Sequence, residues 1–174
     1  MTDQVFPPKD YYITGKVYYT GIGSRSTPNQ VQTQMINIAS ALAAKGYTLR
    51  SGGASGADTA FYRGCILGKG DKEIYLPWGG FNGSISTLYP PSEEAYEIAK
   101  AIHPAWIHLT DGGRALHARN IHQVLGKDLN SPSEFVICWT PDGKEKGGTR
   151  TAIVLAKQRN IRVYNLAVEE FQYL

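Results

Sequence analysis

Three times in this sequence, an apolar run of strand length leads into a loop rich in glycine and small hydroxyl residues, and a helical pattern follows the loop. This repetition constrains the fold more than any other feature, because strands that alternate with helices form a parallel sheet covered by helices. We therefore expect an α/β protein with a mostly parallel central sheet, helices on both faces and a single domain. The three strands are expected at 16–22, 47–50 and 135–139, and their loops at 21–27, 51–58 and 142–149.

The remaining segments extend this alternation to a complete Rossmann-like domain. Residues 78–92 have neither a helical nor a strand period and are expected to form a long loop, a kind of segment that is often functional. We expect the helices at 93–102 and 113–125 to form an outer layer. Residues 1–16 are expected to be an N-terminal arm, and residues 17–174 the domain. Further strands are expected at 72–77 and 161–166, and further helices at 28–45, after 58 and at 149–158.

The composition agrees with a soluble, cytoplasmic domain. Of the 174 residues 42% are hydrophobic, enough for a core without metal or disulfide staples. Eighteen lysines and arginines against fifteen acids give a net charge of +3, too small for nucleic-acid binding to be inferred from bulk charge. Cys65 and Cys138 lack disulfide or metal spacing and are expected to be reduced and packed, and His117 and His122 lack a metal-ligand pattern. We expect no metal, no cofactor and no membrane partner.

The three glycine-rich loops are the expected place of chemistry. In an open α/β sheet, ligands bind beyond the carboxyl ends of the strands, so these loops should converge there. Glycine allows close approach of the backbone, and free amides at a helix N-terminus bind anions, most often phosphate. A single such loop more often makes only a tight turn, and the occurrence of three favours a phosphate site. Ser24 and Arg25 add a hydroxyl and a guanidinium, whereas Asp58 fits a first-turn acid of a helix as well as an acceptor for a ribose hydroxyl.

Other nucleotide-binding patterns are absent from the sequence. Neither the Walker spacing GxxxxGK[ST] nor a GxGxxG after a strand occurs, which removes the main support for an ATPase or a nicotinamide dehydrogenase. The third loop carries several cations, which fit a solvated turn as well as a phosphate-binding role. These cations are Lys144, Lys146 and Arg150. Aromatic residues of the long loop could stack on a base, although such residues more often pin a loop to its own domain. They are Trp78, Phe81 and Tyr89.

Five segments, in this order, resemble the motifs of the DNA-processing protein A family, which belongs to the SLOG superfamily of Rossmann-like nucleotide-associated proteins. The segments are GIGSRSTP (21–28), RSGGASGADTAF (50–61), YLPWGGFNGSISTLYPP (75–91), HARN (117–120) and GGTRTA (147–152). They cover most of residues 17–166, and their order is more specific than any one of them.

The resemblance implies a phosphate-binding pocket formed by the GSR and SGxAxGxD loops, an arginine–asparagine pair and the late glycine–threonine loop. Larger members of the family bind single-stranded DNA as dimers and load a recombinase. Single-stranded DNA is therefore a candidate partner beside a nucleotide-type small molecule, and a homodimer or higher homo-oligomer is expected. The chain is expected to lack the extra terminal domains of those members, which argues against recombinase loading. The expected ligand-binding residues are Gly23, Ser24, Arg25, Ser51, Gly52, Gly53, Ser55, Gly56, Asp58, Trp78, Arg119, Asn120, Gly147, Gly148 and Thr149.

A sister group of the superfamily, the lonely-guy phosphoribohydrolases, implies an alternative activity. These enzymes cleave nucleoside monophosphates with a PGGxGTxxE motif, and the corresponding stretch here, 144–152, has Ala152 at the position of the glutamate. A general acid/base candidate is therefore missing. Other superfamily members sense nucleotide signals in bacterial antiphage defence. The preferred hypothesis is a protein that senses or sequesters a nucleotide or nucleotide-derived signal, in phage–bacterium antiviral defence for example, without catalytic residues. Nucleotide N-glycosidase activity and single-stranded DNA binding are the alternatives.

Overall fold

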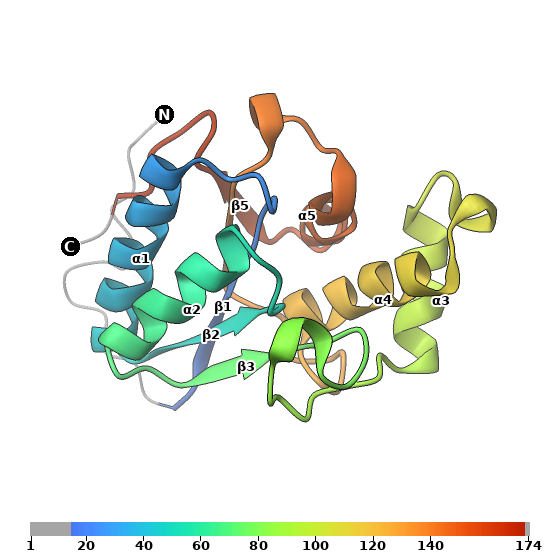
Figure 1. The fold of residues 1–174 in the computed structure, drawn as a ribbon, viewed down its shortest axis with the longest axis horizontal. Helices are drawn as coiled ribbons and strands as arrows, with labels where there is room; N and C mark the ends of the chain where they lie inside the picture. Colours follow the sequence, from blue (N-terminus) through green and yellow to red (C-terminus); the bar gives the residue numbers. More distant parts are fainter. Residues whose placement is uncertain (1–14, 173–174) are drawn as a thin grey trace.

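The computed structural model describes residues 15–172, so the expected arm at 1–16 lies almost entirely outside the described residues. The sheet has five strands in the order β3-β2-β1-β4-β5, and every pair of neighbouring strands is parallel. The strands are β1 (Val17–Gly21), β2 (Tyr47–Ser51), β3 (Lys72–Ile74), β4 (Phe135–Cys138) and β5 (Arg162–Asn165). The expected Rossmann-like α/β architecture is confirmed (Figure 1).

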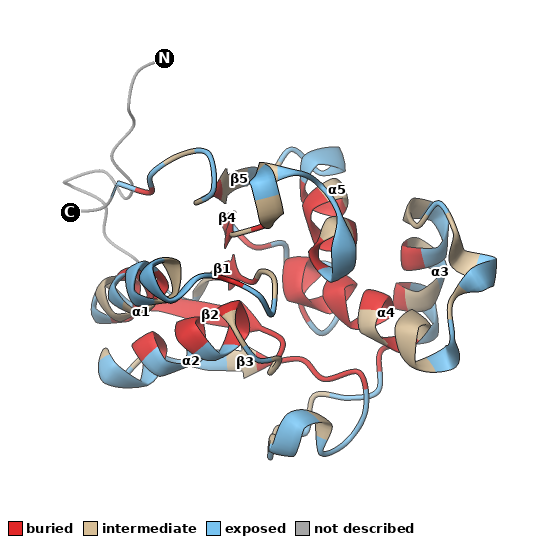
Figure 2. Cartoon of the chain, turned by 45° about the horizontal axis from the view of Figure 1, so that its top comes forward, coloured by how far each residue is buried: buried red, intermediate tan, exposed pale blue. Residues whose placement is uncertain are grey.

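Helices cover both faces of this sheet, as the sequence predicts (Figure 2). Two helices, α1 (Asn29–Ala44) and α2 (Ala57–Leu67), pack on one face. The other face carries α4 (Asp111–Leu125) and α5 (Arg150–Gln158), and α3 (Glu93–Ile102) packs mainly on the outer side of α4. Two hydrophobic cores result, one on each side of the sheet.

Strand β4 separates the two cores. Phe135 and Ile137 lie in the core beneath α1 and α2, whereas Val136 and Cys138 lie in the core beneath α4 and α5. Successive side chains of a strand point to opposite faces, so a strand buried on both faces needs an uninterrupted apolar run. The sequence FVIC has this property, which explains why its position was predictable.

Helix α4 is more deeply buried than the sequence predicts. The expectation of an outer-layer helix at 113–125 is wrong, because ten residues of α4 are buried between the sheet and the neighbouring helices (Figure 2). The polar side chains of residues 113–125 are typical of a surface helix. Three of them, Arg119, Asn120 and Gln123, are instead buried, and Arg119 and Asn120 make the hydrogen bonds described below.

The third strand is shorter than expected. The sequence predicts a strand at 72–77, whereas β3 ends at Ile74, and Tyr75 then forms an isolated parallel bridge with Leu88. The chain from 78 to 92 is a long loop, as predicted, with one short 3-10 turn at Phe81–Gly83. The end of the loop returns beside its start, because the Leu76 amide donates to the Leu88 carbonyl at 3.0 Å.

The two cysteines are free and buried, as the sequence predicts. Within residues 15–172, no group of three or more histidine, cysteine, aspartate or glutamate side chains is arranged to hold a metal ion. None of the helices in that range combines the length and the apolar character that crossing a membrane requires.

Candidate functional site

The strand order places a topological switch point between β1 and β4, because the chain proceeds from β1 to β3 on one side and from β4 to β5 on the other. In such sheets the loops after the two central strands part at the switch point and leave a crevice for a ligand. A crevice of about 510 Å³ lies at this point. It is bounded by the loops after β1 and β4, the start of α2, the middle of α4 and the turn before α5.

Nine of the fifteen residues expected at the site line this crevice, so the glycine-rich loops converge. The first loop contributes Gly23, Ser24 and Arg25, the third loop contributes Gly147, Gly148 and Thr149, and Asp58, Arg119 and Asn120 complete the set. The other six are not part of the lining. They are Ser51, Gly52, Gly53, Ser55, Gly56 and Trp78. Ligand contact by any of the fifteen stays a prediction.

The first loop packs tightly against the end of β4. The Ser24 amide donates to the Trp139 carbonyl at 3.1 Å, and a Cβ on Gly23 would lie 2.8 Å from the Cβ of Ala57. Glycine is therefore needed at position 23 because α2 and β4 leave no room for a side chain. The exposed Arg25 side chain forms no ion pair within residues 15–172, which leaves its guanidinium free for a ligand.

The start of the second loop is packed under α4 rather than at the crevice. A Cβ on Gly52 would lie 2.2 Å from Nε2 of Gln123. The buried Ser51 hydroxyl donates to the last carbonyl of β1 at 2.6 Å and so ties β2 to β1. Close packing therefore accounts for both residues, and the loop reaches the crevice only farther along, at Ala54 and Asp58.

Gly56 allows the second loop to lie on the first. Its φ is +80°, and a Cβ there would lie 2.6 Å from the Arg25 carbonyl oxygen. We expect Gly56→Ala to lower the free energy of unfolding by about 2 kcal/mol or more, because alanine at φ +80° and ψ −120° is strained by about 1–3 kcal/mol and the carbonyl must also move. Urea denaturation measures the loss. Gly147 also has a positive φ, +71°, but open space around it, so Gly147→Ala is the matched control and should cost less. Equal losses would contradict the packing role of Gly56.

Asp58 is a buried carboxyl group in the wall of the crevice. It lies in the first turn of α2, is 4% exposed, and its Oδ2 accepts from the Ala54 amide at 3.1 Å. Burial raises its pKa from 3.8 to about 6, against the attraction of the Arg119 guanidinium and the Ala54 amide. The carboxyl group therefore gains or loses its proton at a pH of about 6, just below neutrality. A pKa perturbed by burial in a cleft is common at functional sites.

Arg119 fastens α4 to two neighbouring segments. Its buried Nη1 donates to the carbonyl oxygens of Gly52 and Tyr75, the latter at 3.1 Å, and its Nε donates to Oδ1 of Asn120 at 3.0 Å. The guanidinium carbon lies 5.6 Å from the centre of the Phe81 ring. Nη2 makes no hydrogen bond within residues 15–172, which leaves this nitrogen for a ligand.

Asn120 connects α4 to the third loop, because its Nδ2 donates to the Gly148 carbonyl. The amides of Gly147 and Gly148 begin the 3-10 turn that leads into α5, and they make no hydrogen bond with the described part of the chain. Nothing lies within 4 Å of the place that a Cβ would take on either residue. Open amides at the beginning of a helix are an arrangement that binds phosphate.

The cations of the third loop differ in their positions. Lys146 lines the crevice and is exposed, whereas Lys144 is not part of the lining. Arg150 turns toward the end of α3, where its Nη1 donates to the Ile102 carbonyl at 3.3 Å. Of the three cations, Lys146 is therefore the one placed to meet a ligand in this crevice.

Phe81 forms the aromatic part of the wall. Trp78 is 44% exposed and contacts Phe81 edge-on, with the ring centres 5.3 Å apart, but only Phe81 lines the crevice. A Cβ on Gly79 would lie 2.8 Å from the Tyr89 ring, so Tyr89 packs against its own loop. The long loop thus reaches the site through Phe81.

Sequence reasoning missed several other residues of the lining. Gln123 is 2% exposed and lies four residues after Arg119, on the same face of α4, so helical spacing offered a signal for it. Thr140 follows β4, and its hydroxyl accepts from Nδ2 of Asn165 at 2.7 Å. Its only signal in the sequence is its place after a strand.

The fold and the crevice define a class: a Rossmann-type α/β protein with a crevice at the switch point of its sheet. Comparison with solved structures shows the fold of DNA processing protein A. The Helicobacter pylori protein, which binds single-stranded DNA, has a TM-score of 0.56 and 17% identity over 90% of this chain and 68% of its own. The Streptococcus pneumoniae protein has a TM-score of 0.52 and 17% identity over 86% of this chain and 50% of its own. No family model and no curated protein matches the sequence.

Proposed function

We propose that the crevice binds the phosphate group of a nucleotide or nucleotide-derived signal, which the protein senses or sequesters. The observation that carries the proposal is the convergence of open backbone amides with cationic side chains at the switch point. Gly147 and Gly148 supply the amides. The cations of the lining are Arg25, Arg119 and Lys146. Positive charge and free amides together favour an anion in a way that neither does alone.

The size and shape of the crevice support a nucleotide rather than a bare ion. Its volume of about 510 Å³ lies within the range of about 300–1,000 Å³ that is usual for small-molecule sites. Phe81 offers an aromatic surface for a base, beside the guanidinium of Arg119. A phosphate at the open amides and a base near Phe81 would both lie along the lining of the crevice.

Arg25→Ala and Lys146→Ala are each expected to weaken the binding of nucleoside monophosphates by about 1–3 kcal/mol, because each removes a charge-assisted hydrogen bond to phosphate. Isothermal titration calorimetry measures the affinity, and thermal melts check the fold. Arg63→Ala is the matched control, since Arg63 is exposed on α2 and is not part of the crevice lining. A protein that binds no nucleotide, or that binds equally well in both crevice variants, would overturn the proposal.

Single-stranded DNA is the second candidate ligand, favoured by the fold shared with the Helicobacter pylori protein. The affinity of a protein that tracks a DNA backbone rises with oligonucleotide length and falls steeply with salt. A nucleotide binder gains nothing from a second or third nucleotide outside its crevice. Fluorescence titration with oligothymidylates of increasing length, at low and high salt, therefore separates the two functions.

The N-glycosidase alternative now depends on Asp58. Ala152 is completely buried in the core beneath α5, so the position of the hydrolase glutamate does not face the crevice. Asp58 is the acidic residue of the crevice lining, and its raised pKa suits proton transfer. Chromatography after incubation with nucleoside monophosphates detects free base, and mass spectrometry of heat-released small molecules identifies a bound ligand. Base release that disappears in Asp58→Asn would replace the binding function by an enzymatic one.

A further inference from the structure

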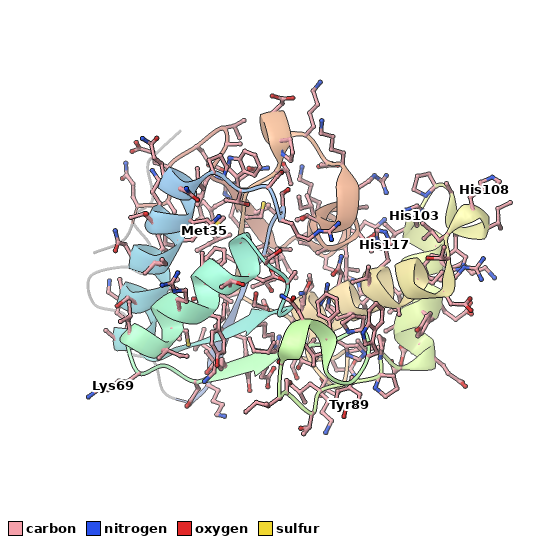
Figure 3. The ribbon with its side chains drawn as sticks, in the orientation of Figure 1. Met35, Lys69, Tyr89, His103, His108 and His117 are labelled. Atoms are coloured by element: carbon pink, nitrogen blue, oxygen red, sulfur yellow. The ribbon has the colours of Figure 1, made fainter. Side chains whose placement is uncertain are left out.

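Two histidines and an arginine meet where α3 ends, between α4 and the start of α5. His103 directly follows α3, and its ring centre lies 4.5 Å from that of His117 on α4 (Figure 3). Arg150, the first residue of α5, reaches the same place, because its Nη1 donates to the Ile102 carbonyl at 3.3 Å. We name these three residues, His103, His117 and Arg150, the histidine–arginine cluster.

Each member of the cluster keeps a nitrogen that has no hydrogen-bond partner within residues 15–172. His117 is 8% exposed, and its Nδ1 lies 2.7 Å from Oγ1 of Thr151, which leaves Nε2 unpaired. Nδ1 of His103 accepts from the Ala105 amide at 3.1 Å, so the ring proton of the neutral side chain is on Nε2. Arg150 uses only Nη1. Three elements thus bring together the Nε2–H of His103, the remaining guanidinium nitrogens of Arg150 and the unpaired Nε2 of His117, which donates in one neutral tautomer and in the imidazolium form.

The charges around the cluster are also unbalanced. Burial lowers the pKa of both histidines, that of His117 to about 4, and Arg150 lowers both further. His103 and Arg119 add to the effect on His117. Among the described residues, no carboxylate acts on either histidine in the opposite direction. An oxyanion placed here would accept hydrogen bonds from these nitrogens and would balance the positive charge of Arg150.

We propose that the histidine–arginine cluster is an anion subsite for a phosphate or phosphate ester group, separate from the crevice and next to it. Arginine pairs well with phosphate oxygens, and the N-terminus of α5 adds a favourable dipole. His117 lies three residues before Asn120 on α4, and their contacts, Thr151 and Gly148, are three residues apart at the start of α5. The subsite therefore continues the crevice along the same seam between the helices. The inference holds whether or not the crevice binds a nucleotide.

Anion binding at this subsite is coupled to protonation of the histidines. An anion favours the imidazolium form, so it raises the pKa of His117 and binds more tightly as the pH falls. Inorganic sulfate is the suitable probe, because its charge stays constant over the range in which phosphate monoesters titrate. We expect the pKa of His117, followed by NMR of the imidazole resonances, to rise by about one unit or more when sodium chloride is replaced by sodium sulfate at equal ionic strength.

Variants test whether the sulfate-dependent rise in the pKa of His117 arises at the histidine–arginine cluster. A His117 variant cannot be used, because it removes the imidazole whose pKa is measured. The deciding variant is Arg150→Gln, in which the pKa of His117 should no longer rise in sulfate. His108→Gln is the matched control, since His108 is exposed on the 3-10 turn Trp106–His108 and makes no ring contact with His103 or His117, and it should leave the shift unchanged. Arg25→Ala should also leave it unchanged, which separates the subsite from the crevice. An unchanged pKa of His117 in sulfate, or a shift that persists in Arg150→Gln or disappears in Arg25→Ala, would overturn the proposal.

Discussion

Replacing Arg119 by methionine is expected to lower the free energy of unfolding by about 3–5 kcal/mol at pH 7.5, the usual cost of removing one member of a buried charged network. The guanidinium is 5% exposed and donates to the carbonyls of Gly52 and Tyr75 and to the side chain of Asn120. Methionine fills much of the volume but leaves these acceptors without a donor, at about 1–3 kcal/mol for each group that stays buried and unpaired. Urea denaturation followed by circular dichroism measures the loss.

Arg25→Met is the matched control for this loss, because it removes the same charge from the same crevice at an exposed position. We expect it to change stability by less than about 0.5 kcal/mol, as surface substitutions usually do. A similar loss in both variants would mean that Arg119 acts through the net charge of the crevice rather than through its hydrogen bonds.

Much of the sheet was predictable because each strand has a local signature. The run FVIC, apolar on both faces, is typical of a strand between two helical layers, and the turns around Gly53 and Gly56 need backbone angles that favour glycine. The depth of α4 was not predictable in this way. Arg119 and Asn120 donate to carbonyls that lie 28 to 67 residues away in the sequence, and no local pattern indicates such partners.

The site was predictable to the extent that it depends on strand ends. Loops after parallel strands must meet at one edge of a sheet, which is why Ser24, Asp58 and Gly148 lie together. The sequence could not say which glycines line the crevice and which pack beneath it, since both uses need the same residue. Gly52 illustrates the second use, because its missing side chain makes room for Gln123. Only the tertiary packing shows whether a glycine lines the crevice or packs beneath it.

The charge of Asp58 is the second feature with a large expected effect. In the folded chain its pKa is about 6, against 3.8 for an ordinary aspartate, because burial disfavours the carboxylate. Between these two values the folded state holds a proton that the unfolded state has lost, so the contribution of Asp58 to stability falls as the pH rises from about 4 to about 6. Above pH 6 the buried carboxylate lowers the free energy of unfolding by its full amount, about 3 kcal/mol from the size of the pKa shift. The native protein thus keeps a destabilising charge in the wall of its crevice.

Asp58→Asn is therefore expected to raise the free energy of unfolding by as much as about 3 kcal/mol at pH 7.5, and to leave it nearly unchanged at pH 4, where the native carboxyl group is neutral. Asparagine keeps an oxygen that can accept from the Ala54 amide and carries no charge that burial would penalise. Urea denaturation of both proteins at pH 4, 5, 6 and 7.5 measures the difference, and Asp71→Asn, at an exposed position, controls for the loss of one negative charge. A gain that is the same at every pH would show that its cause is not the charge of Asp58, and a loss at pH 7.5 would show that the carboxylate is stabilised where it lies. A gain that grows with pH would mean that Asp58 is retained at a cost to stability, as residues at functional sites often are.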